Sequence, residues 1–157
     1  MTKIIQVRPT VREDITAIEQ VLDTIELFPA EMLEEMIHDY LTNKETEHIW
    51  LTACHDTKPV AVAYCAPEML TNGTYNLYAI GVMSDKQGKG IGSQMISYLE
   101  LLLKSRGHRL LLVDTSGTSQ YDKTRAFYYK LGYKQEAVIK DFWAEGDDKV
   151  TFTKKLQ

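Results

Sequence analysis

Three glycines, Gly88, Gly90 and Gly92, lie between a strand-like run at residues 75–83 and a helical pattern at 91–106. The first N–H groups of a helix have no intrahelical acceptor and lie at the positive end of the helix dipole, so they can bind a phosphate or pyrophosphate. Glycine lets such a group come close to the backbone, and Lys89 adds a positive charge. The same spacing also fits a tight strand-to-helix connection that binds nothing.

Two common nucleotide-binding motifs do not fit this loop. A Walker loop has a lysine followed by serine or threonine, whereas Lys89 is followed by Gly90. The Rossmann fingerprint has two residues between its second and third glycines, whereas only Ile91 separates Gly90 from Gly92. No βαβ unit is expected at the N-terminus either, so we expect neither nucleotide fold.

The elements around the loop alternate between strands and helices. Apolar residues with helical spacing indicate helices over 15–25, 30–41, 91–106 and 123–131; in the third, Ile91, Met95, Leu99 and Leu102 share one face. Runs rich in β-branched and aromatic residues predict strands at 4–8, 48–54, 60–66, 75–83, 110–115, 137–142 and 150–155. The order β α α β β β α β α β β indicates one mixed α/β domain, residues 1–157, around a central sheet.

Composition excludes several other classes of protein. The chain has 157 residues and a formal net charge of −4, so it lacks the basic surface that attracts a polyanion, and we expect no nucleic-acid partner. Its longest apolar stretch, near residues 99–103, is far shorter than the roughly 20 residues that span a bilayer, so we expect no membrane association. The N-terminal residues lack the apolar block and cleavage site of a signal peptide, which indicates the cytoplasm.

The two cysteines, Cys54 and Cys65, lie in neighbouring strands of a predicted hairpin with its turn at 55–59. Cys54 would pair near Val60 and Cys65 near Ile49, which places the thiols about 11 residues out of register, too far apart for a disulfide. A metal site that adds a nearby histidine has no ligand spacing to support it. We therefore expect buried, inert thiols and no metal.

Two segments together resemble one family. Gln87-x-x-Gly90-x-Gly92 matches the pattern (Gln or Arg)-x-x-Gly-x-(Gly or Ala), and residues 124–133 resemble Ala-x-x-Phe-Tyr-x-x-x-Gly-Phe. Both patterns are similar to those of the GNAT superfamily of acyl-CoA-dependent N-acetyltransferases, and the order of elements agrees along the whole chain. The resemblance implies a mixed, mostly antiparallel sheet of about six to seven strands flanked by about four helices.

The resemblance also implies which residues bind acetyl-CoA, the expected co-substrate. The pyrophosphate would be held mainly by main-chain N–H groups, and the pantetheine would pair with the end of the preceding strand like an added strand. One amide of that strand would face the thioester oxygen. The residues concerned are Gln87, Gly88, Lys89, Gly90, Ile91 and Gly92 for the pyrophosphate, and Ile80 and Val82 for the pantetheine.

Tyr128 occupies the position of the family's usual general acid. A phenol with a pKa near 10 can protonate a departing thiolate. The alternative role is an aromatic residue that packs on the sheet, but Phe127 and Leu131, four residues apart, already form a packing face, so we expect Tyr128 to point elsewhere. The family often has an asparagine several residues earlier, where this chain has Tyr121 or Asp122.

A base must accept the proton of the attacking amine, directly or through water. Asp114, which directly follows the apolar run 110–113 of the predicted strand, is the first candidate, because ligands of open α/β sheets bind outside the carboxyl ends of strands. It fits equally well as a cap of the turn at 115–117. Glu68, Tyr78 and His108 are weaker candidates, and a water relay would need no dedicated residue.

By the same resemblance, the acceptor pocket is built from the first two helices and the last strand pair. The candidate lining residues are Phe28, Met32, Met36, Phe142 and Trp143, although apolar residues at helical spacing equally fit a core. The acids between 141 and 148 would favour a cationic amine, but they also fit a solvated turn.

The sequence therefore predicts an N-acetyltransferase that moves an acetyl group from acetyl-CoA to a primary amine by direct attack in a ternary complex. The acceptor would be a small molecule or a peptide N-terminus, and the protein a monomer or homodimer. The alternative is a catalytically idle acyl-CoA-binding module that senses or regulates. Tyr128 beside an intact loop at 87–92 favours the enzyme.

Overall fold

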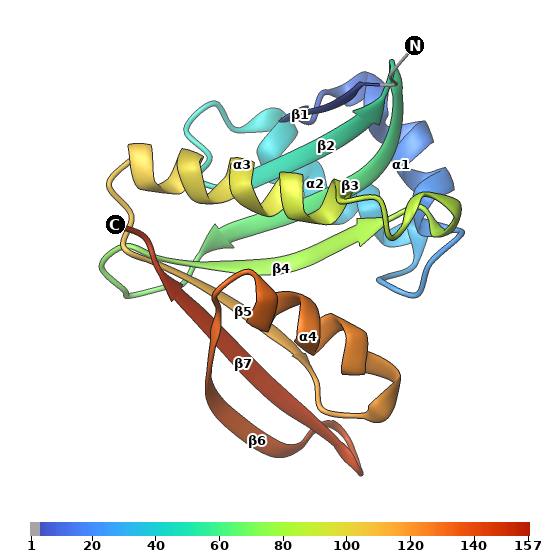
Figure 1. Ribbon diagram of the computed structural model, residues 1–157. Coiled ribbons are helices and arrows are strands. Elements are labelled where there is room, and N and C mark those ends of the chain that lie inside the picture. The colour runs from blue at the N-terminus through green and yellow to red at the C-terminus, as the bar shows by residue number, and fades with distance from the viewer. Residues whose placement is uncertain (1–3) are drawn as a thin grey trace. The chain divides into compact units, whose positions relative to one another are not determined.

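The structure is a computed structural model that describes residues 4–157, so the first three residues of the N-terminal segment discussed above lie outside it. The elements follow the predicted order (Figure 1). The strands are β1 Ile5–Pro9, β2 Ile49–His55, β3 Lys58–Pro67, β4 Thr74–Val82, β5 Leu110–Ser116, β6 Lys134–Ala144 and β7 Asp147–Lys155. The helices are α1 Ile15–Leu22, α2 Leu33–Thr42, α3 Ile91–Ser105 and α4 Asp122–Lys130, with short 3₁₀ turns at Arg12–Asp14, Ala30–Met32, Ser84–Lys86 and Ser119–Tyr121.

Seven strands form one mixed, mostly antiparallel sheet in the order β1-β2-β3-β4-β5-β7-β6. This is the predicted fold class. The chain divides into two compact units, the first comprising residues up to Ala66 and Tyr78–Leu101, the second Pro67–Leu77 and Leu102–Gln157. Strand β4 contributes its first half to the second unit and its second half to the first. The prediction of a single domain stays a prediction.

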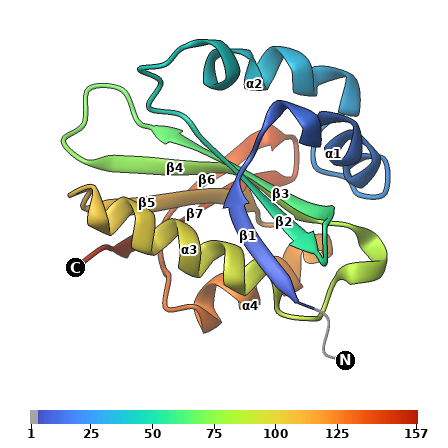
Figure 2. The same ribbon diagram turned by 90° about the horizontal axis from the view of Figure 1, so that it is seen from above.

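In the first unit, β1, β2 and β3 form an antiparallel ladder between α1 and α2 on one side and α3 on the other (Figure 2). One face of this ladder holds the core cluster Ile15, Ile18, Leu22, Leu33, Ile37, Trp50 and Val62. Helix α1 ends at Leu22, so Ile25 lies outside it, contrary to the expected stripe. In α3, Leu103 is fully buried and Leu102 is only half-buried, so Leu103 completes the buried face.

The hairpin of β2 and β3 confirms the prediction for the cysteines in most respects. Cys65 pairs with Ile49 as expected, whereas Cys54 pairs with Pro59 because a β-bulge at Ala53 and Cys54 shifts the register. Both thiols are free and buried. Burial also raises the pKa of both thiols above their usual value, which keeps them protonated and unreactive.

In the second unit, β4 pairs in parallel with β5 over Thr74–Leu77, and β7 lies antiparallel between β5 and β6. Strand β5 continues to Ser116, beyond the expected end at Thr115, and β6 extends from Lys134 to Ala144, so it includes Trp143. Every residue of β6 is exposed, as expected of a strand at the edge of the sheet.

Candidate functional site

The glycine loop between β4 and α3 has a backbone that requires glycine. Gly88 has φ 75° and Gly90 has φ 81°, both in the left-handed region that other residues rarely adopt. No atom lies within 4 Å of the position that a Cβ would take at either residue. The backbone conformation, rather than a lack of space, therefore requires the glycines, and both residues are exposed.

Hydrogen bonds hold this loop at both ends. The side chain of Gln87 donates from Nε2 to the carbonyl of Val82 at 3.0 Å, which ties the loop to the end of β4. The N–H of Gln94 donates to the carbonyl of Gly90 at 3.1 Å, so the three N–H groups before Gln94 precede the intrahelical ladder of α3. The loop can present these N–H groups to an anion, and exposed Lys89 lies beside them in the chain.

The end of β4 is fastened to the segment that follows α1. Ile80 and Val82 are half-buried there, and Ser84 N donates to Thr24 Oγ1 at 3.2 Å. A Cβ at Gly81 would lie 2.4 Å from Ile25 Cδ1, so the glycine allows this close approach. Sequence reasoning missed Gly81; its only signal was a glycine inside a strand, which often marks a close approach of another segment.

The three expected acceptor residues near the first two helices differ in how far they are exposed. Phe28 and Met36 are half-buried and pack against the core cluster, which is the alternative that the sequence left open. Met32 is 45% exposed at the start of α2. Of the three, only Met32 offers a large accessible apolar surface.

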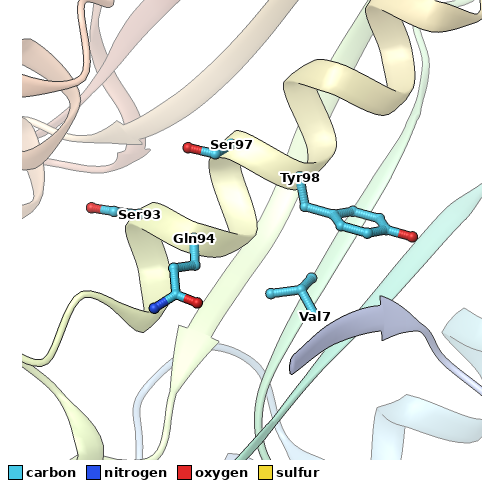
Figure 3. Close-up of a pocket in the computed structure, with 5 residues that line it drawn as sticks. All are labelled: Val7, Ser93, Gln94, Ser97 and Tyr98. Atoms are coloured by element: carbon cyan, nitrogen blue, oxygen red, sulfur yellow. The ribbon is translucent and has the colours of Figure 1, made fainter. Parts of the chain in front are cut away.

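A shallow pocket of about 400 Å³ lies elsewhere in the first unit (Figure 3). Val7 of β1 faces four residues of α3 there, Ser93, Gln94, Ser97 and Tyr98. None of the residues expected to bind acetyl-CoA or the acceptor lines this pocket. It adjoins the glycine loop through Ser93 and Gln94, which directly follow Gly92.

Tyr128 is the buried residue of α4, with 2% of its surface exposed. Its ring contacts Phe127, Tyr133 and Phe152 with centroid distances of 5.2, 5.6 and 5.7 Å. The expectation that Tyr128 points away from the packing face is wrong, because Phe127 and Leu131 are only half-buried. Burial raises the pKa of Tyr128 well above its usual value, so the phenol stays protonated.

Asp114 lies within β5 rather than at its end. Its Oδ1 accepts a hydrogen bond from Thr151 Oγ1 at 2.6 Å, and Asn76 Nδ2 approaches its Oδ2 at 3.5 Å. Asn76 Nδ2 also donates to Glu68 Oε1 at 2.7 Å. The structure thus brings Asp114 and Glu68, two of the candidate bases, to one asparagine, and both bonds of Asp114 lead to neighbouring strands rather than to the turn at 115–117.

Phe142 and Trp143 are each 49% exposed, and their rings meet edge-on with centroids 4.8 Å apart. The ladder of β6 and β7 is irregular between Ile139 and Ala144, which includes both aromatic residues. Lys149 Nζ lies 4.1 Å from the Phe142 centroid, and Trp143 Nε1 donates to Thr115 O at 3.3 Å. The pair is an accessible aromatic surface of the second unit.

Two other structural findings concern the whole described chain. Residues 4–157 contain no group of three or more His, Cys, Asp or Glu side chains arranged to hold a metal ion. In the same range, no helix is both long and apolar enough to cross a membrane.

The model of the acetyltransferase (GNAT) family matches residues 11–133, which include the glycine loop and Tyr128. The chain belongs to the acetyltransferase (GNAT) family. No match was found among curated protein sequences.

Three solved structures have a similar fold. A crystal structure from Desulfovibrio desulfuricans, assigned to the GNAT family, is 27% identical with a TM-score of 0.90 over 98% of this chain and 100% of that one. The ribosomal-protein-S18-alanine N-acetyltransferase of Escherichia coli is 16% identical with a TM-score of 0.79 over 98% and 95%. An aminoglycoside 6'-N-acetyltransferase complexed with coenzyme A is 21% identical with a TM-score of 0.76 over 97% of each chain.

Proposed function

We propose that this GNAT acetyltransferase transfers an acetyl group from acetyl-CoA to a primary amine while both are bound. The observation that carries the proposal is the exposed loop in which left-handed Gly88 and Gly90 lead into α3. The space beside the backbone of Gly88 and Gly90 is open, since no atom lies within 4 Å of the position that a Cβ would take at either residue. A structure with the same fold contains coenzyme A, which supports this choice of ligand.

The main-chain N–H groups of residues 87–92 hold the pyrophosphate in this proposal. The backbone of Ile80 and Val82 pairs with the pantetheine in the manner of an added β-strand. One of their N–H groups then faces the thioester oxygen and stabilises the negative charge that develops there. Such a donor contributes about 3–4 kcal/mol in comparable sites.

Tyr128 supplies the proton for the departing thiolate. Burial raises its pKa, so the phenol is protonated throughout the useful pH range and acts only as a donor. Proton transfer to a thiolate in water would be uphill, because an unperturbed thiol has a pKa of about 8.5 and a phenol about 10. The buried surroundings that raise the pKa of the phenol also disfavour a thiolate. The pKa of the thiol therefore rises as well, and proton transfer from the phenol to the thiolate stays accessible.

Asp114 accepts the proton that the amine must lose. The neutral amine nitrogen bonds to the acetyl carbon, the bond from that carbon to sulfur breaks, and the sulfur receives its proton from Tyr128. Solvent then returns a proton to the Tyr128 phenolate and accepts the proton that Asp114 took from the nitrogen. An ionised carboxylate has about four lone-pair sites, and Thr151 and Asn76 account for two at Asp114. The remaining sites are free to accept the proton of the amine.

The acceptor is a small amine or a peptide N-terminus. Exposed Phe142 and Trp143 offer it an aromatic surface, and Met32 is the corresponding candidate in the first unit. The structural relatives include enzymes named for an aminoglycoside and for the alanine of a ribosomal protein, so both classes of acceptor belong in the first screen.

The test is release of the coenzyme A thiol from acetyl-CoA in the presence of pooled amino acids, polyamines, aminoglycosides and short peptides. The proposal predicts release that depends on one pool, with a matching acetylated product detected by mass spectrometry. Thiol release without acceptor, or none from any pool despite measured acetyl-CoA binding, contradicts amine acetylation. The second result would favour the idle acyl-CoA-binding module.

A further inference from the structure

Strand β1 lies at one end of the sheet, and within residues 4–157 its only strand partner is β2. The N–H of Thr10 donates to the carbonyl of Trp50, and the N–H of Asp56 donates to the carbonyl of Ile4, each at 3.0 Å. In an antiparallel ladder, residues bonded in this way alternate with residues whose N–H and C=O point away from the partner strand. The even-numbered residues of β1 therefore face β2, and the odd-numbered residues face outward.

Ile5 and Val7 each present one main-chain N–H and one C=O along this outer edge. They are two residues apart, which is the spacing at which an added strand forms its hydrogen bonds. Pro9, the next outward residue, has no N–H, and its carbonyl already accepts a hydrogen bond from Arg8 Nη1 at 3.2 Å. The open part of the edge is therefore short and ends before Pro9.

Val7 also lines the pocket of about 400 Å³, where it faces α3 (Figure 3). The residues of α3 that complete the pocket form two neighbouring rows of the helix and are all uncharged: Ser93 with Ser97, and Gln94 with Tyr98. Their hydroxyl, amide and phenol groups form no hydrogen bond with any other described residue. The pocket thus places neutral hydrogen-bonding side chains beside the outward main-chain groups of Val7.

We propose that the outer edge of β1 and this pocket bind an extended peptide segment of another protein as an added strand. The peptide residue opposite Val7 exchanges two main-chain hydrogen bonds with it. Directly opposite residues of a sheet point to the same face, so the side chain of that residue enters the pocket. An ionised side chain would lose its hydration there without gaining an opposite charge, so the pocket selects an uncharged residue.

The chemistry of the edge favours a separate peptide over a second copy of this chain. Two β1 strands paired symmetrically about Val7 would place Ile5 of each opposite Pro9 of the other. Proline has no N–H, so the carbonyl of Ile5 would have no donor from the opposing residue. A peptide with an ordinary residue at that position supplies the donor.

Amide hydrogen exchange, measured by NMR, tests the edge and the added strand in wild-type protein. Without peptide, the amides of Ile5 and Val7 should exchange faster than those of Gln6 and Arg8, which donate to β2. The probes are capped pentapeptides in which threonine alternates with valine, leucine or aspartate, and the same peptides N-methylated at every residue. We expect a valine or leucine peptide to slow exchange at Ile5 and Val7, and the N-methylated and aspartate peptides not to do so.

The opposite results overturn the proposal. They are equal exchange at the four amides of the free protein, no slowing by either uncharged peptide at millimolar concentration, or the same slowing by the N-methylated peptides. Slowing that increases with protein concentration in the absence of peptide would show that a second copy pairs with β1, which also overturns the peptide as the occupant.

Val7→Pro removes the outward N–H and no hydrogen bond to β2, so it should weaken binding of the valine or leucine peptide about tenfold. Val7→Thr is the matched control, because it keeps the N–H and the β-branched shape and should bind the peptide as the wild type does. Acetyl-CoA affinity should be unchanged in both variants, since Val7 lies outside the proposed acetyl-CoA site. Unchanged peptide affinity in Val7→Pro, or an equal loss in Val7→Thr, overturns the site; if Val7→Pro fails to fold, the exchange measured in the wild type decides.

Discussion

Replacing Gly90 by alanine tests whether the loop before α3 binds the coenzyme. Gly90 and Gly107, which follows the end of α3, both have φ 81°. Neither has an atom within 4 Å of the position that a Cβ would take. The two alanine variants therefore impose the same backbone strain without a steric clash, and Gly107→Ala is a matched control outside the loop.

The expected magnitudes follow from this geometry. A residue with a Cβ in the left-handed region costs about 1–2 kcal/mol, so each variant should lose about that much of the free energy of unfolding. At Gly90, rotation of φ that relieves the strain turns the N–H groups that precede Gln94 away from their direction. One lost bond to a charged phosphate costs about 1.5–3 kcal/mol, which weakens acetyl-CoA affinity about 10- to 150-fold.

The assay combines urea unfolding with calorimetric titration of acetyl-CoA. Both variants should lose similar stability, while only Gly90→Ala should lose affinity. Gly107→Ala should bind acetyl-CoA as the wild type does. If the folded Gly90→Ala protein binds acetyl-CoA as tightly as Gly107→Ala, the loop does not hold the pyrophosphate and the reasoning is refuted.

Three further predictions concern stability. Hydrogen bonds from Arg8 lower the pKa of Asp14, so this pair stabilises the fold above the unfolded pKa of about 3.9 and loses that contribution as pH falls. Asp14→Asn should therefore lower the free energy of unfolding in urea by about 1–2 kcal/mol at pH 7 and by progressively less below pH 4. A cost independent of pH would contradict this prediction. Burial raises the pKa of Tyr128, so above about pH 10 the residue ionises in the unfolded chain but not in the folded one, and stability should fall as pH rises. Tyr128→Phe should show a smaller loss of stability at alkaline pH in the same assay. An equal loss in the variant would show that another group ionises. Arg125 Nη1 donates to two main-chain carbonyls, those of Ser116 and Thr118. Arg125→Lys should lower the free energy of unfolding, measured by thermal unfolding, by about 1–2 kcal/mol. Unchanged stability in this variant would show that the two bonds contribute nothing.

Local patterns in the sequence were enough to predict the order of elements and the glycine loop. Periodicity and glycine spacing act within a few residues, so the strand-to-helix loop at 87–92 could be located directly. The hairpin turn likewise set the pairing of Cys65 with Ile49. The bulge that moved Cys54 to Pro59 has no marker in the sequence, because it arises from the fit of two strands.

The environment of Tyr128 depended on residues far along the chain. Helix α4 is short and mostly polar, so Phe127 and Leu131, the residue that follows the helix, were predicted to form its packing face. The actual packing face is set by Tyr133 and Phe152, which surround Tyr128. No spacing within the helix contains that information.

Asn76 was missed for a related reason. A single amide in a strand has no motif, and its significance comes from Glu68 and Asp114, which β3, β4 and β5 bring together from separate parts of the chain. The one available signal was a polar residue between Tyr75 and Leu77 in a strand whose first half is otherwise buried and largely apolar.

The most direct test of the account is acceptor-dependent thiol release by wild type, Tyr128→Phe and Tyr129→Phe. Phenylalanine preserves the ring contacts of Tyr128 and removes only the hydroxyl. Tyr129 is 53% exposed and its hydroxyl donates to Gln135, so Tyr129→Phe controls for loss of a phenol from the same helix. We predict about a 10²-fold lower kcat for Tyr128→Phe with acetyl-CoA affinity unchanged, and normal turnover for Tyr129→Phe. Equal turnover in wild type and Tyr128→Phe would contradict it.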